Sequence, residues 1–241
     1  QLPPVGAGNV LQDIIASELL PTVCLTQVFR QAMESLIVTN AHKIVGGEYP
    51  VLDVTDKDFF FLSRNDVSST ADTVTELYAQ RLPKAYGYDP LTDIQIICPS
   101  RKGLTGTVSL NTALQKILNP PSKDKEDLER GSKLFREGDK VMQIKNNYDI
   151  IWTKGKEVSS GIFNGDIGRI IAINHNASFM KIDFDGRIAL YPFDNIGELE
   201  LAYAITVHKS QGSEFEAVIM PVCNVIPQLS YRNLLYTAVT R

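Results

Sequence analysis

The sequence is poor in cysteine and histidine, the residues that build disulfide frameworks and most metal sites. It has 3 of each in 241 residues. Cys24, Cys98 and Cys223 are far apart, form no CxxC pair and are odd in number, which argues against a disulfide framework. No histidine lies at metal-ligand spacing from a Cys or another His, so we predict no structural metal. Reduced, buried thiols in a cytoplasmic protein are the simplest account.

The sequence also lacks segments that would direct it to a membrane. No apolar run approaches the roughly 20 residues that a spanning helix needs. The first residues, QLPPVG, have neither the charged nor the apolar region of a signal peptide. The chain starts with Gln1 rather than Met and stops at Arg241 in an unfinished pattern, so we expect part of a longer protein.

Two further absences concern nucleotide chemistry. The phosphate-binding pattern G-x-x-x-x-G-K-[ST] is missing, and Gly155-Lys156 is followed by Glu157. No apolar strand ends in an Asp-Glu pair that could hold Mg²⁺, because Glu126-Asp127 lies in a charged connector. The sequence therefore contains no complete site for a nucleoside triphosphate.

The net charge of −4 does not indicate a nucleic-acid-binding protein, whose usual mark is a basic face. The local field in a groove matters more than the total. From Lys133 to Lys156 there are six basic residues against three acidic ones. Charge alone does not decide whether DNA is a ligand.

The first half of the chain alternates strands with helices, which predicts a parallel sheet with helices on its faces. We expect buried strands at residues 58–62 and 94–98. Helices are predicted at about residues 33–45, ending at Gly46-Gly47, and at residues 68–82 and 103–118, which prolines terminate. Residues 122–132 are highly charged and indicate an exposed connector or a marginal helix.

From about Lys133 the pattern changes to short strands with turns. Strands are expected at residues 140–145, 167–173, 179–184 and 187–193, with Asp185-Gly186 as a hairpin turn. This region predicts a small antiparallel barrel, after which the chain returns to the parallel sheet.

The stretch from Leu199 to Val222 consists of two apolar runs around the polar sequence TVHKSQGSE. Thr206 and Ser210 offer hydroxyls, Lys209 a charge, and Gly212 a close backbone approach, which suits phosphate binding at the end of a strand. On spacing alone, an ordinary hairpin or crossover loop explains the stretch as well.

This stretch, as ITVHKSQGSEF, resembles motif V of the RecD-like branch of superfamily 1 DNA helicases. Four other stretches resemble further family segments in the family's order: motif III, motif IV, a DNA-contacting segment and motif VI. They are QLPPVGAGNVLQDII (1–15), LTQVFRQA (25–32), IICPSRKGLTGTVSLNTALQ (96–115) and LLYTAVTR (234–241).

The resemblance implies an α/β fold, in which a RecA-like parallel-sheet domain is interrupted by a small antiparallel SH3-like β-barrel. We expect residues 1–132 and 198–241 to form the motor domain and residues 133–197 the barrel. It also implies a 5′-to-3′ helicase of DNA recombination or repair that uses ATP and Mg²⁺. The missing half of the nucleotide site would come from an N-terminal RecA-like domain, without which we expect no ATP hydrolysis.

For the nucleotide, the resemblance implies that Arg30 of motif IV and Arg241, the arginine finger of motif VI, converge on the γ-phosphate. Taken alone, either arginine would be read as a surface salt bridge, and Glu214 as a solvated loop acid. The complete implied ATP-binding set is Gln1, Arg30, Gln31, Gly212, Glu214 and Arg241.

For single-stranded DNA, the resemblance implies contacts from the motif V stretch and from the start of the helix at 103–118. His208 is equally readable as a packed structural residue, and Arg101 as a solvated end. In the basic stretch, Trp152 lies in what we predict to be a long loop, whereas we expect Phe163 in the barrel core. The predicted DNA-binding set is Ser100, Arg101, Asn111, Thr206, His208, Lys209, Ser210 and Trp152.

The expected partners are single-stranded DNA and duplex junctions, the N-terminal RecA-like domain, and other helicase–nuclease subunits, with no membrane. Two alternatives remain. The chain could be a non-catalytic module in which the barrel binds protein or single-stranded DNA, or the helicase part of a conjugative relaxase.

Overall fold

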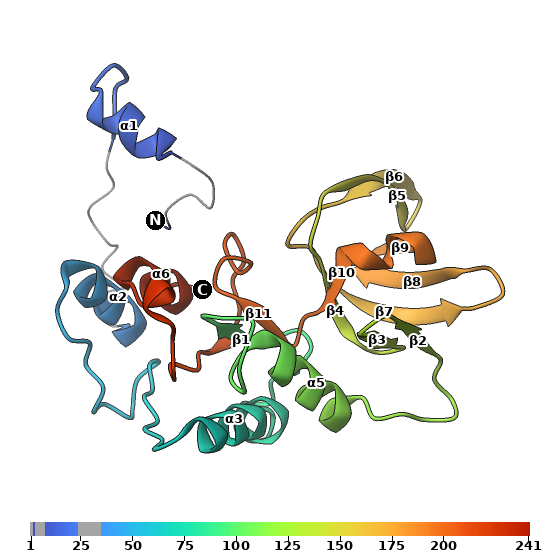
Figure 1. The fold of residues 1–241 in the computed structure, drawn as a ribbon, viewed down its shortest axis with the longest axis horizontal. Coiled ribbons are helices and arrows are strands. Elements are labelled where there is room, and N and C mark those ends of the chain that lie inside the picture. Colours follow the sequence, from blue (N-terminus) through green and yellow to red (C-terminus); the bar gives the residue numbers. More distant parts are fainter. Residues whose placement is uncertain (1, 3–7, 24–34) are drawn as a thin grey trace. The chain divides into compact units, whose positions relative to one another are not determined.

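A computed structural model describes residues 2, 8–23 and 35–241. The chain forms two compact units (Figure 1). One comprises residues 1–63 with 226–241, and the other residues 64–225. Among the described residues, no helix has the length and apolar character needed to cross a membrane.

The described part of the first unit is helical, and the longest helix there, α2 (Leu36–Gly46), has both ends capped. Ser35 accepts a hydrogen bond from Val38 N at the start, and Gly47 ends the helix at φ 83°. The other described helices of the unit are α1 (Val10–Ala16), η4 (Pro227–Leu229) and α6 (Arg232–Val239).

The predicted buried strand at residues 58–62 is wrong. The Asp58 carboxylate accepts hydrogen bonds from Leu36 N at 2.7 Å and Ile37 N at 3.2 Å, so this segment serves the start of α2. Phe60 and Phe61 are each 53% exposed. The aromatic run indicated burial, but the use of Asp58 as a cap fixes its neighbours in a surface loop.

The second unit contains a three-stranded parallel sheet in the order β11-β1-β12. Its strands are β1 (Ile94–Cys98), β11 (Ala204–Thr206) and β12 (Ala217–Ile219). Since β11 and β12 flank β1 and both run parallel to it, residues 207–216 form a crossover and not a hairpin. Cys98 is buried in β1, and this burial raises the pKa of its thiol to about 12.

Helices from both sides of β1 in the sequence pack on this sheet around Tyr78, Leu110 and Leu114. They are α3 (Val67–Glu76), η2 (Leu77–Arg81), α4 (Leu82–Tyr86) and α5 (Thr107–Leu118). The predicted stop at Pro83 is wrong because the helix continues to Tyr86. The π-turn at η2 precedes a first turn in which Pro83 needs no backbone donor.

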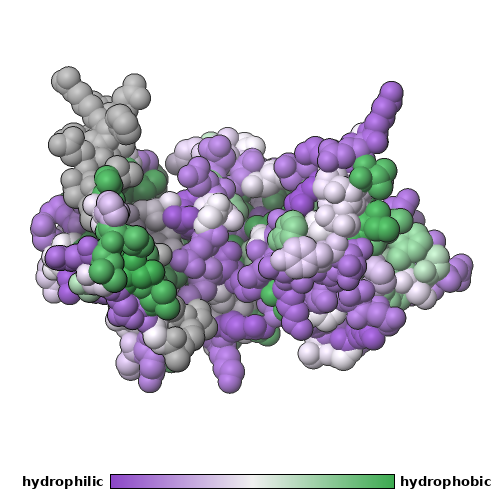
Figure 2. Space-filling model, turned by 90° about the horizontal axis from the view of Figure 1, so that it is seen from above, coloured by the Kyte–Doolittle hydropathy of each residue, from purple (hydrophilic) through white to green (hydrophobic). Residues whose placement is uncertain are grey.

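The antiparallel part is a seven-stranded sheet in the order β10-β4-β7-β8-β9-β5-β6. It encloses an apolar core that includes Phe135, Ile170, Ile182, Phe184 and Tyr191. The strands are β4 (Lys140–Gln143), β5 (Asn147–Lys154), β6 (Glu157–Ile162), β7 (Ile167–Asn174), β8 (Phe179–Phe184), β9 (Arg187–Pro192) and β10 (Leu199–Leu201), with η3 (Phe193–Glu198) before β10. In the space-filling view, hydrophilic residues dominate the visible face, interrupted by separate apolar patches (Figure 2).

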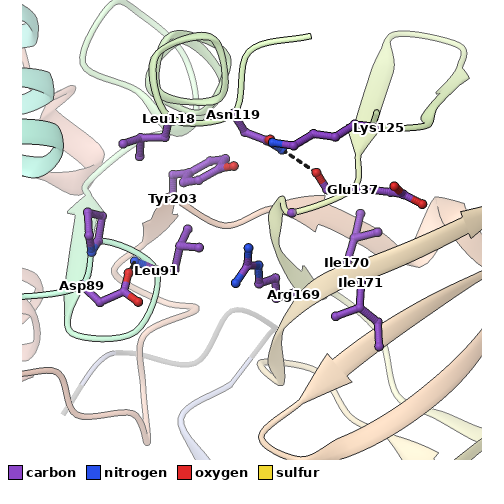
Figure 3. A pocket seen from close by; sticks show the side chains of 12 residues that line it. Asp89, Leu91, Leu118, Asn119, Lys125, Glu137, Arg169, Ile170, Ile171 and Tyr203 are labelled. Atoms are coloured by element: carbon purple, nitrogen blue, oxygen red, sulfur yellow. Dashed lines mark hydrogen bonds between the residues drawn. The ribbon is translucent and has the colours of Figure 1, made fainter. Parts of the chain in front are cut away.

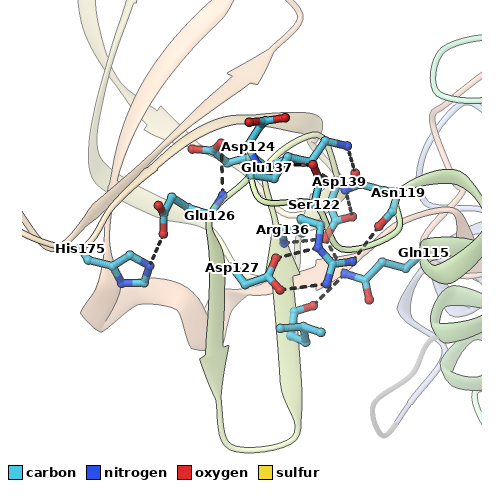
Figure 4. Close-up of polar contacts among 12 residues, drawn as sticks. Gln115, Asn119, Ser122, Asp124, Glu126, Asp127, Arg136, Glu137, Asp139 and His175 are labelled. Carbon is cyan, nitrogen blue, oxygen red and sulfur yellow. Dashed lines mark hydrogen bonds and ion pairs between the residues drawn. The ribbon is translucent and has the colours of Figure 1, made fainter.

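The charged connector at residues 122–132 contributes β2 (Asp127–Arg130), which pairs with β3 (Lys133–Arg136). Arg136 is 4% exposed and binds the Asp127 carboxylate with two nitrogens, at 2.6 and 2.9 Å (Figure 4). It also donates to Asn119 O at the end of α5, at 2.7 Å. This hairpin therefore joins the antiparallel sheet to the helices of the parallel sheet.

Candidate nucleic-acid interface

The register of the parallel sheet brings two predicted DNA-binding segments to one edge. Cys98 of β1 lies opposite Thr206 of β11, and Val207 N donates to Cys98 O at 3.1 Å. The loops that follow, residues 99–106 and 207–216, therefore start side by side at the carboxyl edge. In open α/β sheets, ligands bind at this edge.

The first of these loops is shaped by backbone hydrogen bonds to the start of α5. Thr107 N donates to Ser100 O and Val108 N to Arg101 O, both at 3.2 Å. A Cβ at Gly106 would lie 2.4 Å from Lys102 O, so only glycine allows this tight approach. Ser100 and Arg101 are thus held at the sheet edge, before the helix begins.

The second loop begins with a tight turn. Lys209 N donates to Thr206 O at 2.9 Å, and Ser210 Oγ to Val207 O at 2.9 Å. Ser210 is fully buried, so its hydroxyl stabilises the turn, while Thr206 and His208 remain partly exposed. Gly212, at φ 86°, and Glu214 are exposed further along.

A small pocket of about 50 Å³ lies where these loops meet the antiparallel sheet. Its polar lining comes from Arg101, Thr107, Glu200, Thr206 and Lys209. Three of the predicted DNA-binding residues, Arg101, Thr206 and Lys209, therefore share one site. Glu200, which the sequence analysis missed, is the acidic member of the pocket and binds Arg101 Nη2 at 2.6 Å.

Basic groups gather around Glu200. Lys133 Nζ donates to Leu199 O at 2.7 Å. Desolvation lowers the pKa of both Lys133 and Lys209; the Glu200 carboxylate raises each pKa and the Arg101 guanidinium lowers it. One carboxylate thus faces three cationic side chains, and the edge is locally basic although the whole chain is acidic.

Asn111 has a structural use in this unit. Its Nδ2 donates to Leu201 O and Ala204 O, both at 2.9 Å, and its Oδ1 accepts from Ala204 N at 2.8 Å. The residue is 8% exposed, so its side chain holds the start of β11 against α5. The signal was available, because Asn111 lies three residues before the buried Leu114, and residues three apart share one face of a helix.

The aromatic residues of the basic stretch lie differently from the prediction. Trp152 is not in a loop but in β5, where it packs against the apolar core, and its indole Nε1 is buried without a partner among the described groups. Arg187 lies over its ring at 5.8 Å. Phe163, expected in the core, is 40% exposed, and Tyr148 is 65% exposed. Their rings meet edge to face at 5.5 Å.

The structure describes three of the six predicted nucleotide-side residues. Gln1, Arg30 and Gln31 fall outside the described residues, so the convergence of Arg30 with Arg241 stays a prediction. Arg241 belongs to the helical unit, where its Nε donates to Thr237 O at 3.1 Å. Across the described ranges, no three His, Cys, Asp or Glu residues form a group that could hold a metal ion.

A cavity of about 590 Å³, which the sequence analysis did not predict, lies by the loop before β1 (Figure 3). Leu91, Leu118 and Ile171 supply apolar lining, and Asp89 and Arg169 line it with opposite charges. Because Ile94 begins β1, this cavity belongs to the amino edge of the sheet. None of the predicted site residues that the structure describes lines it.

Two family descriptions match the sequence. Residues 110–184 match the "ATP-dependent RecD-like DNA helicase SH3 domain", and residues 201–241 the "UvrD-like helicase C-terminal domain". The first match covers α5 in part and the antiparallel part as far as β8, and the second covers the second loop of the interface and the chain's last helix. They also agree with an α/β fold that combines a RecA-like parallel sheet with an SH3-like barrel.

Relatives match over the whole chain. It is 34% identical to the ATP-dependent RecD2 DNA helicase of Deinococcus radiodurans, aligned over 100% of this chain and 30% of that protein. It is 26% identical to the RecBCD enzyme subunit RecD of Mycobacterium tuberculosis, over 100% of this chain and 41% of that protein. The chain thus spans well under half the length of these relatives.

Among solved structures, the crystal structure of Bacteroides Pif1 bound to ssDNA has the same fold. Its TM-score is 0.52 at 16% identity, covering 100% of this chain and 57% of that one. Together with the motifs, the sequence matches support a C-terminal RecD-like helicase portion.

Proposed function

We propose that this chain is the second motor domain, with its SH3-like insert, of an ATP-dependent 5′-to-3′ DNA helicase of recombination or repair. The motor segments would be residues 1–132 and 198–241, and the insert residues 133–197. The observation that supports this proposal most directly is the pairing of Cys98 with Thr206. It brings two polar loops side by side at the carboxyl edge of a parallel sheet. Such an edge binds phosphates through hydroxyls, backbone N–H groups and basic side chains.

Ser100, Arg101, Thr206 and His208 are the proposed phosphate contacts, since they flank the pocket or its loops and retain exposed surface. Ser210 and Asn111 would act indirectly, by holding the turn after β11 and the start of that strand. Tyr148 takes over the base-stacking role that we predicted for Trp152, because its ring is the more exposed.

Binding of a labelled single strand to this chain tests the proposal. We expect an affinity that falls steeply as salt rises, since phosphate contacts release counterions. Arg101→Ala should reduce the salt slope by about one phosphate contact. Absence of binding even at low salt would reject strand contacts and favour a protein-interaction module.

For nucleotide, the proposed contacts are those that the family resemblance implies, since arginine side chains and backbone N–H groups bind phosphate. Arg241 would supply the arginine finger and Arg30 its partner. Gly212 has open space around the position that a Cβ would take, so its backbone and the nearby Glu214 are accessible to a ligand. Mg²⁺ and most phosphate contacts would come from another RecA-like domain, because this sequence has no G-x-x-x-x-G-K-[ST] pattern.

ATPase assays test the nucleotide role. This chain alone should not hydrolyse ATP, and measurable turnover by the pure chain would reject the proposal. In a protein that carries both RecA-like domains, Arg241→Ala should abolish hydrolysis and leave DNA binding nearly unchanged. The reverse pattern would assign Arg241 to the DNA strand.

A further inference from the structure

Lys209 is a predicted DNA contact whose charged group is already used within the protein. Its Nζ donates to Ile144 O at 3.3 Å and to the side-chain oxygen of Asn164. Both acceptors belong to the antiparallel part, whereas the backbone of Lys209 belongs to the loop after β11. The side chain therefore spans from one sheet to the other.

The acceptor side of this link is a closed turn. Asp166 N donates to Phe163 O at 2.9 Å, and Phe163 N donates to Asp166 Oδ2 at 2.8 Å. Gly165 N donates to Gln143 O of β4 at 2.9 Å. Asn164 thus presents its oxygen from a turn that is fastened at both ends.

The donor side is equally defined. The turn at Thr206–Ser210 holds the backbone of Lys209, and the same loop continues to Gly212 and Glu214, the proposed nucleotide-side residues. On the acceptor side, Phe163 is part of the turn itself and contacts Tyr148. A single ammonium group therefore stands between the nucleotide-side loop and the exposed aromatic pair.

We propose that Lys209 is a positioning residue that ties the loop after β11 to the turn at residues 163–166. The tie fixes the aromatic pair Tyr148–Phe163 relative to the phosphate contacts, and it passes movement of the Gly212–Glu214 segment to that pair. The inference rests on the proposed strand binding. It assigns Lys209 to the connection between the aromatic pair and the Gly212–Glu214 segment, and not to a contact with a DNA phosphate.

Hydrogen exchange of the chain without DNA tests the tie itself. In Lys209→Met and in Asn164→Ala, amides of residues 163–166 and of the loop after β11 should exchange about tenfold faster, since each change removes a charge-assisted hydrogen bond. Lys116→Met, at an exposed position of α5, is the matched control and should leave both segments unchanged. Unaltered exchange in both test variants would overturn the proposal.

A double-mutant cycle in strand binding tests its consequence. Tyr148→Ala should weaken binding about tenfold in the wild-type chain and only about threefold in the Lys209→Met chain. Lys209→Met should weaken binding without changing the salt slope, and Asn164→Ala should reproduce it. A slope reduced by about 0.7, with Asn164→Ala neutral, would make Lys209 a phosphate contact. Failure of the wild-type chain to bind would instead reject the proposed function, while the exchange result still decides on the tie.

Discussion

The polar groups at the two edges of the parallel sheet differ in burial and in how many hydrogen bonds they make. At the amino edge, Asp139 is fully buried and accepts from Gln115 Nε2 at 2.6 Å, Asn119 Nδ2 at 2.7 Å and Arg136 N at 2.7 Å (Figure 4). It also accepts from Tyr203 OH at 2.9 Å. At the carboxyl edge, Ser100, Thr206 and His208 keep exposed surface. A saturated buried network stabilises the junction of the two sheets, whereas an incompletely used polar edge is suited to a ligand.

The largest expected effect on the amino edge is a loss of stability in Asp139→Ala. Four buried donors would lose their acceptor, so we expect the free energy of unfolding to fall by about 3 kcal/mol or more. Urea unfolding measures this loss. Asp72→Ala, on the exposed side of α3, should change the free energy by less than about 0.5 kcal/mol. If Asp139→Ala lowers the free energy of unfolding by no more than Asp72→Ala does, the buried network does not stabilise the fold.

Lys140 places a buried positive charge at the amino edge. It is 2% exposed and donates to Ile94 O at 3.1 Å. Burial lowers the pKa of Lys140 to about 8, although Asp89 and Asp93 partly oppose that shift. At pH 7 the ammonium is charged in both folded and unfolded chains, so its burial opposes folding, and Lys140→Met should stabilise the fold by about 1–2 kcal/mol.

The pH dependence of the free energy of unfolding tests the lowered pKa of Lys140. Between about pH 8 and the ordinary lysine pKa of about 10.4, the unfolded chain binds the extra proton, so this group makes stability rise with pH. Urea unfolding across this range should show the rise in the wild-type chain and a smaller rise in Lys140→Met. Parallel curves for the two chains would contradict the lowered pKa.

Among the proposed strand contacts, Tyr148→Ala should weaken single-strand binding about tenfold, because an exposed ring contributes roughly 1–3 kcal/mol per stacked base. Fluorescence anisotropy with a labelled strand measures the change. Trp152→Phe should alter the affinity less than about twofold, since its ring packs against the core. A larger loss from Trp152→Phe would return the stacking role to Trp152.

The smallest expected effect is a gain. Glu200 holds the Arg101 guanidinium at 2.6 Å, so Glu200→Gln should free this charge and raise single-strand affinity about threefold at low salt. The gain should vanish at high salt, where exposed charges are screened. Lower affinity in Glu200→Gln would mean that the ion pair orients Arg101 for binding.

The sequence predicted the fold class, because strand pattern and motif order constrain topology. It assigned residues of both loops to DNA contacts, but the meeting of the two loops is a finding of the structure. Cys98 and Thr206 each end an apolar run, and a parallel sheet aligns such ends. The bridging use of Lys209 was not predictable, since Asn164 is distant in sequence and joins it only through the tertiary fold.

The aromatic positions show where residue pattern fails. The alternation along β5 turns Trp152 inward, which polar flanking residues concealed, and the turn at 163–166 leaves Phe163 partly exposed. Asp58 was misjudged for a related reason, because its role as a helix cap depends on a helix over twenty residues earlier in the chain.

Photo-crosslinking of a single strand to the chain, with the modified residues identified by mass spectrometry, tests the difference between the edges most directly. The account predicts crosslinks in residues 100–102, in residues 206–214 and at Tyr148, all lost at high salt. Crosslinks confined to the amino-edge cavity around Asp89 and Arg169 would contradict it.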